Sequence, residues 1–366
     1  MLNAPIHHSP FTIQHYEMAN YLRDFMSDAP VLSARRPTIN EFFLSAYTLS
    51  IYTGCELGCP YCDSWLFGDR PLNETIHIPL DLPQRLDAEL AHVDRGDLIA
   101  ITALSDPYQP AEQTYRITRQ TLQVLADKGQ PCLLQTKSAS VLEDAALLQR
   151  MNESGLAIVM TTLVTMDPHL SEKLEGKAPP PALRLEMLAE LKRAGVPVGV
   201  AILPVMPYVN DTQSALRAML RACAEARVDF VIWDYLHIPN ERHRSRVNEI
   251  LARVGSFPHS YYRDIYQGQA TVSAAYRHDR DVELLGRCDG LGLEVRAPQR
   301  IFAGKLSPAN EAALLLKHSA FRDRVQGRDR VARIHHSLAE QIYAGDLRPA
   351  ALRDSPLALT IREILE

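Results

Sequence analysis

The sequence lacks the features that would mark it for a membrane, for export or for bulk contact with nucleic acid. It contains no uninterrupted apolar run long enough to span a bilayer. Its first residues lack the basic flank and apolar core of a secretory leader. Acidic residues slightly outnumber basic ones, and a formal net charge of −5 gives no overall attraction to nucleic acid. We therefore expect a cytoplasmic protein that does not contact a membrane.

Cysteine is also scarce, which argues against a disulfide framework. Six cysteines occur among 366 residues, and half of them fall in one short segment. Cys132 and Cys223 lie in apolar or helical surroundings, where we expect buried, unreactive thiols. This usage is typical of a reducing compartment. Cys288, in the segment GRCDG (286–290), is interpreted as a structural cysteine. The alternative for Cys288 is a hydrogen donor or a substrate-binding thiol.

The other three cysteines, Cys55, Cys59 and Cys62, form the run GCELGCPYC at positions 54–62. This spacing lets one short loop place three thiolates around one face of a cubane cluster. A [4Fe–4S] cluster is usually held by four cysteines. No fourth cysteine lies nearby, so one iron would stay open to bind a small chelating molecule. Two alternatives are a tetrahedral zinc site completed by a distant histidine and an ordinary cluster completed by a remote cysteine.

Beyond residue 45 the chain alternates short apolar runs with amphipathic stretches. The apolar runs, interpreted as strands, cover 46–52, 98–103, 132–136, 157–162, 198–203 and 230–233. The amphipathic stretches, interpreted as helices, cover 114–128, 142–154, 182–194 and 212–226. Strand–helix alternation implies a parallel sheet with right-handed crossovers. Six such units predict an α/β fold, a partial (β/α)6 TIM-like barrel.

This pattern divides the chain into three predicted parts. They are an N-terminal extension (1–44), the partial barrel (45–240) and a mainly helical C-terminal subdomain that covers the barrel (241–366). In the last part, 311–317 and 330–342 are predicted helices, and 286–296 is predicted to be a glycine-rich turn and a strand. The cysteine loop would follow the first strand. Active sites of α/β barrels lie at the carboxyl ends of the strands, so the loop stands where catalysis is expected.

Polar residues follow the next predicted strands at the same edge. Ser105 and Asp106 follow the second strand, Lys137 follows the third and Thr162 ends the fourth. Lys137 is either placed to reach a ligand carboxylate or a solvated loop lysine. The Thr162 hydroxyl is placed to bond a ribose, the alternative being a threonine present only as a strand former. Asp106 is either a ligand contact or the local cap of a rigid turn.

Later segments add further candidates. Arg184 begins a helix near Glu175 and is suited to pair with a carboxylate, the alternative being an ordinary surface ion pair. The sixth strand leads into Asp234, Tyr235 and His237, which are expected to line a substrate pocket. Tyr235 is therefore a candidate catalytic residue.

Together these segments resemble a known family. The cysteine run, with Tyr61 before the third cysteine, resembles the signature of radical S-adenosylmethionine (SAM) proteins. The segments DPYQP (106–110) and TKS (136–138), and the stretch from Glu175 through Arg184, are similar to the spore photoproduct lyase-like branch. The resemblance covers roughly residues 47–240. It implies a partial barrel that binds a [4Fe–4S] cluster and SAM.

The resemblance also implies roles for particular residues. The three cysteines would bind the cluster, and Tyr61 would pack near the adenine of SAM. Ser105, Lys137, Thr162 and Arg184 would be SAM contacts. Reductive cleavage of SAM would give a 5′-deoxyadenosyl radical that takes a hydrogen atom from the substrate.

The chain departs from the lyase itself at the residues that return the hydrogen atom. That enzyme uses a cysteine in the second-strand loop and a tyrosine after the third cluster cysteine. Here Ala103 and Asp63 stand at these positions, and neither side chain can donate a hydrogen atom. We therefore predict a different reaction, with Asp63 suggesting a polar substrate or, alternatively, making a local loop hydrogen bond.

The leading hypothesis is a radical SAM enzyme acting on a small polar molecule such as a nucleoside, nucleotide, sugar or amino acid. Its candidate catalytic residues are Asp63, Asp106, Tyr235 and Cys288. An external donor such as flavodoxin or ferredoxin would supply electrons. We do not expect a nucleic-acid partner, because the arginines of 322–333 alternate with acids and lack interleaved aromatics. The alternatives are a nucleic-acid repair or modification enzyme and a non-enzymatic Fe–S or zinc module.

Overall fold

The computed structural model describes residues 19–24, 29–66, 72–101, 105–255 and 259–366. Its centre is a six-stranded parallel sheet in the order β2-β4-β5-β6-β7-β8. The strands are β2 (Tyr47–Thr48), β4 (Ile99–Ile101), β5 (Cys132–Gln135), β6 (Ala157–Thr162), β7 (Val198–Val205) and β8 (Phe230–Tyr235). Ile99 pairs with Tyr47 on one side and with Cys132 on the other. A separate parallel pair joins β1 (Asn20–Asp24) to β3 (Thr75–Pro79).

Helices follow most strands and return the chain to the start of the next one. In the barrel they are α1 (Leu82–Glu89), α2 (Ala111–Tyr115), α3 (Ile117–Lys128), α4 (Ala145–Ser154), α5 (Pro168–Glu175), α6 (Pro181–Arg193) and α7 (Gln213–Glu225). Single 3-10 turns are η1 (Asp63–Leu66), η2 (Leu90–His92) and η3 (Ala139–Asp144). The order of the strands and their parallel pairing confirm the predicted α/β half-barrel.

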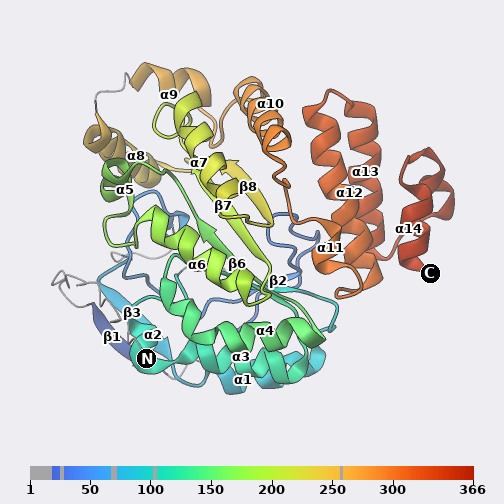
Figure 1. Cartoon of the computed structure of the whole chain (residues 1–366), viewed down its shortest axis with the longest axis horizontal. Helices are drawn as coiled ribbons and strands as arrows, with labels where there is room; N and C mark the ends of the chain where they lie inside the picture. Colours follow the sequence, from blue (N-terminus) through green and yellow to red (C-terminus); the bar gives the residue numbers. More distant parts are fainter. Residues whose placement is uncertain (1–18, 25–28, 67–71, 102–104, 256–258) are drawn as a thin grey trace, which may run out of the picture.

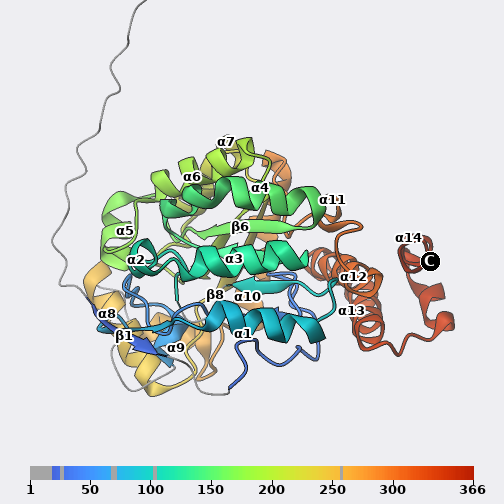
Figure 2. The ribbon, with the colours of Figure 1, turned by 90° about the horizontal axis from the view of Figure 1, so that it is seen from below.

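The remaining elements are almost all helical. They are α8 (Glu241–Val254), α9 (His259–Tyr266), α10 (Ala274–Leu291), α11 (Gln299–Phe302), α12 (Pro308–Val325), α13 (Asp329–Ala344), η4 (Pro349–Asp354) and α14 (Ala358–Leu365). Figure 1 shows α11 to α14 at one end of the sheet and α5, α8 and α9 at the opposite end. Figure 2 shows α3 and α4 lying along one face of the sheet.

Both faces of the sheet are buried, which explains why the strands appear in the sequence as continuous apolar runs. Val159 belongs to the core beneath the barrel helices, whereas its neighbours Ile158 and Met160 belong to a second core. That second core contains Phe302 of α11 and Leu316 of α12. The C-terminal helices therefore pack against the face that the barrel helices leave open.

Two predicted elements differ in the structure. The segment 286–296 is not a turn and a strand, because α10 continues to Leu291 and ends at Gly292, whose φ is +67°. Gly286 lies inside α10 and does not have a positive φ, so that glycine does not mark a turn. The predicted helix 114–128 is divided at Arg116, which has φ +54° between α2 and α3.

In the described part of the chain, no helix is both long and apolar enough to cross a membrane.

Candidate active site

The cysteine loop leaves β2 and is shaped by two glycines. Gly54 has φ +91°, and a Cβ there would lie 2.3 Å from the carbonyl oxygen of Thr75, so the chain needs glycine at this point. Two tight turns follow, in which the Gly58 amide donates to Cys55 and the Cys62 amide donates to Cys59. Cys55 and Cys59 are buried, and Cys62 is partly exposed. The loop therefore carries three thiols from two successive turns at the carboxyl edge of the sheet.

Gln109 fixes this loop from the neighbouring strand exit. Its side-chain oxygen accepts from the Glu56 amide at 2.8 Å, and its side-chain nitrogen donates to the Gly54 carbonyl at 3.2 Å. These two backbone groups flank Cys55. Glu56 in turn accepts from the Ala111 amide at the start of α2. Gln109 is fully buried, and nothing in the sequence pattern distinguished it from its neighbours.

Asp106 joins the second strand exit to the third. Its carboxylate accepts from the Thr136 hydroxyl at 2.6 Å, the Lys137 amide at 2.8 Å and the Tyr108 amide at 2.9 Å. The side chain is buried. Two neighbouring backbone amides and one hydroxyl donate to this carboxylate, which is the pattern of the local cap.

Four charged or polar side chains meet beside Cys59. Lys137 Nζ lies 3.4 Å from Cys59 Sγ and 3.2 Å from Glu175 Oε1. Arg184 Nη1 lies 2.7 Å from the other oxygen, Glu175 Oε2. The Tyr61 hydroxyl donates to Glu175, and its ring centroid is 5.3 Å from Lys137 Nζ. We call Lys137, Glu175, Arg184 and Tyr61 the charged centre.

In the charged centre, burial and neighbouring charges shift the pKa values of Lys137 and Glu175 in opposite directions. Burial alone would lower the pKa of Lys137, but the nearby Cys59, Tyr61 and Glu175 raise it well above its usual range. Burial alone would raise the pKa of Glu175, but Lys137 and Arg184 lower it. Both groups are therefore held in their charged forms. The Glu175–Arg184 pair is fully buried, so the alternative of a surface ion pair is wrong.

Two atoms of the charged centre have unused hydrogen-bonding capacity. Among the residues that the structure describes, Arg184 Nη2 and Glu175 Oε2 are buried without a hydrogen-bond partner. Arg184 Nη1 and Nε already donate to the carbonyls of Thr162 and Pro179. Native proteins seldom leave such atoms unpaired, so Arg184 Nη2 is a candidate donor to a bound ligand.

The predicted hydroxyl contacts are engaged within the protein. The Ser105 hydroxyl donates to the Tyr52 carbonyl at 2.8 Å. The Thr162 hydroxyl accepts from the side chain of Gln135 at 2.8 Å. Both residues lie at the strand exits, as expected.

On the other side of the cysteines, η1 faces α8. Asp63 is exposed, and crowding by the surrounding protein raises its pKa, while His243 and His237 oppose that rise. His243, on α8, is buried with neither ring nitrogen hydrogen-bonded to any described residue. Burial lowers the pKa of His243, with Asp63 acting in the opposite direction. Next to them, Arg246 stacks 3.3 Å above the Trp65 ring. No sequence pattern singled out His243, which is a single histidine in a basic helix.

Two predicted catalytic residues lie elsewhere. The Tyr235 hydroxyl donates to Asp281 on α10 at 2.8 Å, and its ring packs edge-on against Tyr276. Cys288, also on α10, is fully buried where this helix packs against α7, and its charge environment includes Cys223 and Arg322. Of the four candidates, the structure brings Asp63 and Asp106 to the cysteine loop. Tyr235 contacts α10, and Cys288 lies on that helix. Ala103 lies outside the described residues.

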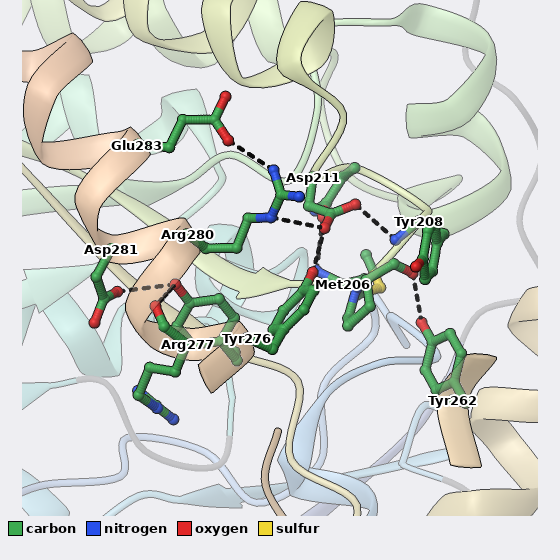
Figure 3. A network of polar contacts seen from close by, with 12 residues as sticks. Met206, Tyr208, Asp211, Tyr262, Tyr276, Arg277, Arg280, Asp281 and Glu283 are labelled. Carbon is green, nitrogen blue, oxygen red and sulfur yellow. Dashed lines mark hydrogen bonds and ion pairs between the residues drawn. The ribbon is translucent and has the colours of Figure 1, made fainter. Parts of the chain in front are cut away.

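The exit of β7 is held by a further polar network, shown in Figure 3. Asp211 accepts from the Tyr208 amide at 2.6 Å and from the Tyr276 hydroxyl. Arg280 lies between Asp211 and Glu283, at 3.7 and 2.6 Å. Tyr208 has φ +59° and is 40% exposed. Such a backbone angle is uncommon outside glycine and persists only where the surroundings fix it.

The donor geometry bears on the kind of metal group that the cysteines suit. Within the described ranges, no three His, Cys, Asp or Glu side chains converge closely enough to hold one metal ion. A tetrahedral zinc site needs its donors around a single ion. In a cubane, each thiolate binds a different iron, so the sulfurs of one loop can stay apart. Three thiols from one loop are a donor set in which each could take its own iron.

Comparison with known proteins gives a consistent result. Residues 49–220 match the model of the Radical SAM superfamily. An uncharacterised protein of Mycobacterium tuberculosis is 27% identical over 244 residues, covering 63% of this chain and 70% of the relative. The Radical SAM Nalpha-GlyT isomerase of Pseudomonas phage M6 is 22% identical over 253 residues, covering 67% of this chain and 51% of the relative.

A solved structure shares the fold. Spore photoproduct lyase with bound AdoMet and dinucleoside spore photoproduct superposes with a TM-score of 0.54 at 12% identity. The match covers 69% of this chain and 76% of that one. At this identity the likeness establishes the shared half-barrel fold alone.

Proposed function

We propose that this chain is a radical SAM enzyme acting on a small polar substrate, because residues 49–220 match the model of a superfamily whose members use a [4Fe–4S] cluster and SAM. Cys55, Cys59 and Cys62, which are free thiols of one loop, would each bind one iron of the cluster. When bound, cluster and SAM supply reductive cleavage to a 5′-deoxyadenosyl radical that abstracts hydrogen. An external donor such as flavodoxin or ferredoxin supplies the electron.

The observation that carries this proposal is the charged centre beside Cys59. Lys137 and Arg184 share one carboxylate, Glu175, and Lys137 also contacts the Cys59 sulfur. Arg184 Nη2 is buried and makes no hydrogen bond to the described residues. A bound carboxylate would accept from that nitrogen. SAM carries such a carboxylate, so the residues present fit this cofactor.

Different residues of the protein would fix the loops, contact the cofactor and bind the substrate. Gln109 and Asp106 fix the loops that carry Cys55 and Lys137. Glu175 orients Lys137 and Arg184 toward the cofactor side. The remaining task is substrate binding, and we assign it to the face of Asp63, His237 and His243.

Two properties support that assignment. His243 keeps one donor and one acceptor that no described residue uses. Asp63 adds a carboxylate next to the third cysteine and disfavours anionic groups. A substrate with hydroxyl, amine or amide groups fits this face better than one that presents a phosphate there.

The experiment is anaerobic reconstitution with iron and sulfide, reduction by dithionite, addition of SAM and quantification of 5′-deoxyadenosine. Cys59→Ala is the matched control, and Cys132→Ala controls for a cysteine outside the loop. We expect product from the wild type and from Cys132→Ala and none from Cys59→Ala. An intact cluster that yields no 5′-deoxyadenosine, with or without metabolite extract, would contradict the proposal.

A second candidate function, action on a nucleic acid, is favoured by one observation. The rings of Tyr208 and Tyr261 lie 4.7 Å apart, and both residues are at least 40% exposed. Exposed aromatic rings near a catalytic mouth can stack on bases. Salt-dependent binding of a single-stranded oligonucleotide that weakens in Tyr261→Ala, but not in Leu359→Ala on exposed α14, would support this function. Equal binding by both variants would exclude this role for the tyrosines.

A further inference from the structure

Lys137 is unusual among the residues of the charged centre because it contacts both a carboxylate and a cluster cysteine. Its Nζ lies 3.4 Å from Cys59 Sγ and 3.2 Å from Glu175 Oε1. The Lys137 side chain is 15% exposed, and Glu175 is not exposed at all. An ammonium group this close to sulfur, in such poor contact with water, is weakly screened.

The reduction potential of an Fe–S cluster depends on net charge, on hydrogen bonds to its sulfurs and on exposure to solvent. Reduction adds one electron, so a fixed positive charge at a ligating sulfur stabilises the reduced form more than the oxidised one. A hydrogen bond to the thiolate acts in the same direction. If Cys59 binds an iron, Lys137 supplies both the positive charge and the hydrogen bond at its sulfur.

We propose that Lys137 is a positioning residue that raises the reduction potential of the cluster through Cys59. The inference rests on the proposed function, since it requires the cluster. It goes beyond that function because it concerns the protein before SAM binds. The electron comes from dithionite in the test below, and no covalent bond of the protein changes.

The partners of Lys137 give the proposal a second, opposite test. Glu175 holds Lys137 in place but also brings a negative charge near Cys59. Arg184 pairs with Glu175 Oε2 and so takes up part of that charge. Glu175→Gln removes the carboxylate charge and leaves both cations. This substitution should therefore move the potential in the direction opposite to that caused by Lys137→Met.

The experiment uses the full chain, reconstituted anaerobically and without SAM, in a dithionite titration followed by electron paramagnetic resonance. Lys137→Met removes the charge at nearly constant volume, and Lys137→Arg keeps it. Lys173→Met, an exposed lysine on the same helix as Glu175, is the matched control. Iron and sulfide content is measured for each variant.

We expect Lys137→Met to lower the ratio of reduced to oxidised cluster about tenfold at a fixed potential, equivalent to 59 mV for one electron. Lys137→Arg should recover most of this change, Lys173→Met should match the wild type, and Glu175→Gln should raise the ratio. A fully loaded Lys137→Met with the wild-type potential overturns the inference and leaves the proposed function intact.

The two possible failures are distinguishable. If the wild type assembles no cluster, the proposed function fails, and the inference fails with it. If Lys137→Met alone loses its cluster, Glu175→Gln decides, because a lowered potential in that variant contradicts the inference and a raised one supports it.

Discussion

Replacing Asp106 by asparagine distinguishes a catalytic carboxylate from a structural one. One carboxylate oxygen accepts from the Tyr108 amide and the Thr136 hydroxyl, and the other accepts from the Lys137 amide. An asparagine has only one accepting oxygen. Whichever way its amide is turned, its NH2 group faces a backbone N–H, of either Tyr108 or Lys137. The variant therefore places two donors against each other in a buried site.

The size of the effect follows from these contacts. The lost hydrogen bond leaves one buried N–H unpaired, which costs about 1–3 kcal/mol. The free energy of unfolding should therefore fall by about 1–3 kcal/mol. That loss is large against a total stability of about 5–15 kcal/mol for a typical domain.

The assay is urea denaturation of the cluster-free chain, followed by circular dichroism, with hydrogen exchange at the Lys137 amide as the local probe. Asp87→Asn, which removes the charge of a half-exposed carboxylate paired with Lys128, is the matched control and should change stability by less than about 1 kcal/mol. If Asp106→Asn is as stable as the wild type but forms no 5′-deoxyadenosine, the structural interpretation of Asp106 is refuted.

Three further outcomes are expected. Gly54→Ala should fold but assemble little cluster, because φ is +91° and the new Cβ would lie 2.3 Å from the Thr75 carbonyl; normal iron content would contradict this. Cys288→Ala should keep full 5′-deoxyadenosine formation, because the thiol is buried between α10 and α7; loss of product with an intact cluster would restore its catalytic role. Ser355→Ala, which removes the partner of Nε2 of the buried His335 at 3.0 Å, should lower the melting temperature through a loss of about 1–3 kcal/mol without changing product yield. An unchanged melting temperature would show that this contact does not stabilise the C-terminal helices.

The sequence allowed much of the barrel to be predicted, for a physical reason. Strands buried on both faces require apolar residues at every position, so β5 to β8 stand out as continuous runs. The cysteine spacing is equally local. Lys137 was a candidate because it follows a strand, and Arg184 because it begins a helix. The burial of their shared partner, Glu175, depends on the fold and could not be predicted.

Other features depend on contacts between distant segments and could not be predicted. Gln109 acts on Gly54 and Glu56, more than fifty positions away, and an isolated glutamine has no periodic signature. His243 lies on α8, and it comes near Asp63 only because α8 packs against η1. The helix α10 contains two glycines that suggested a turn, yet packing against α7 and α12 keeps it helical to Leu291. Tertiary packing here outweighs the weak helix propensity of glycine.

We propose that substrate specificity depends on the side of η1 and α8, from the polar contacts at the two sides of the cysteine loop. At the second and third strand exits, Asp106 and Gln109 use their polar atoms on neighbouring loops. Such residues cannot recognise a substrate without breaking the scaffold that positions the cysteines. On the η1 and α8 side, the ring nitrogens of His243 have no hydrogen-bond partner among the described residues, and Asp63 stands open to solvent. Changes of substrate within this architecture should therefore map to η1 and α8, while substitutions at the strand exits should first affect stability and cluster assembly.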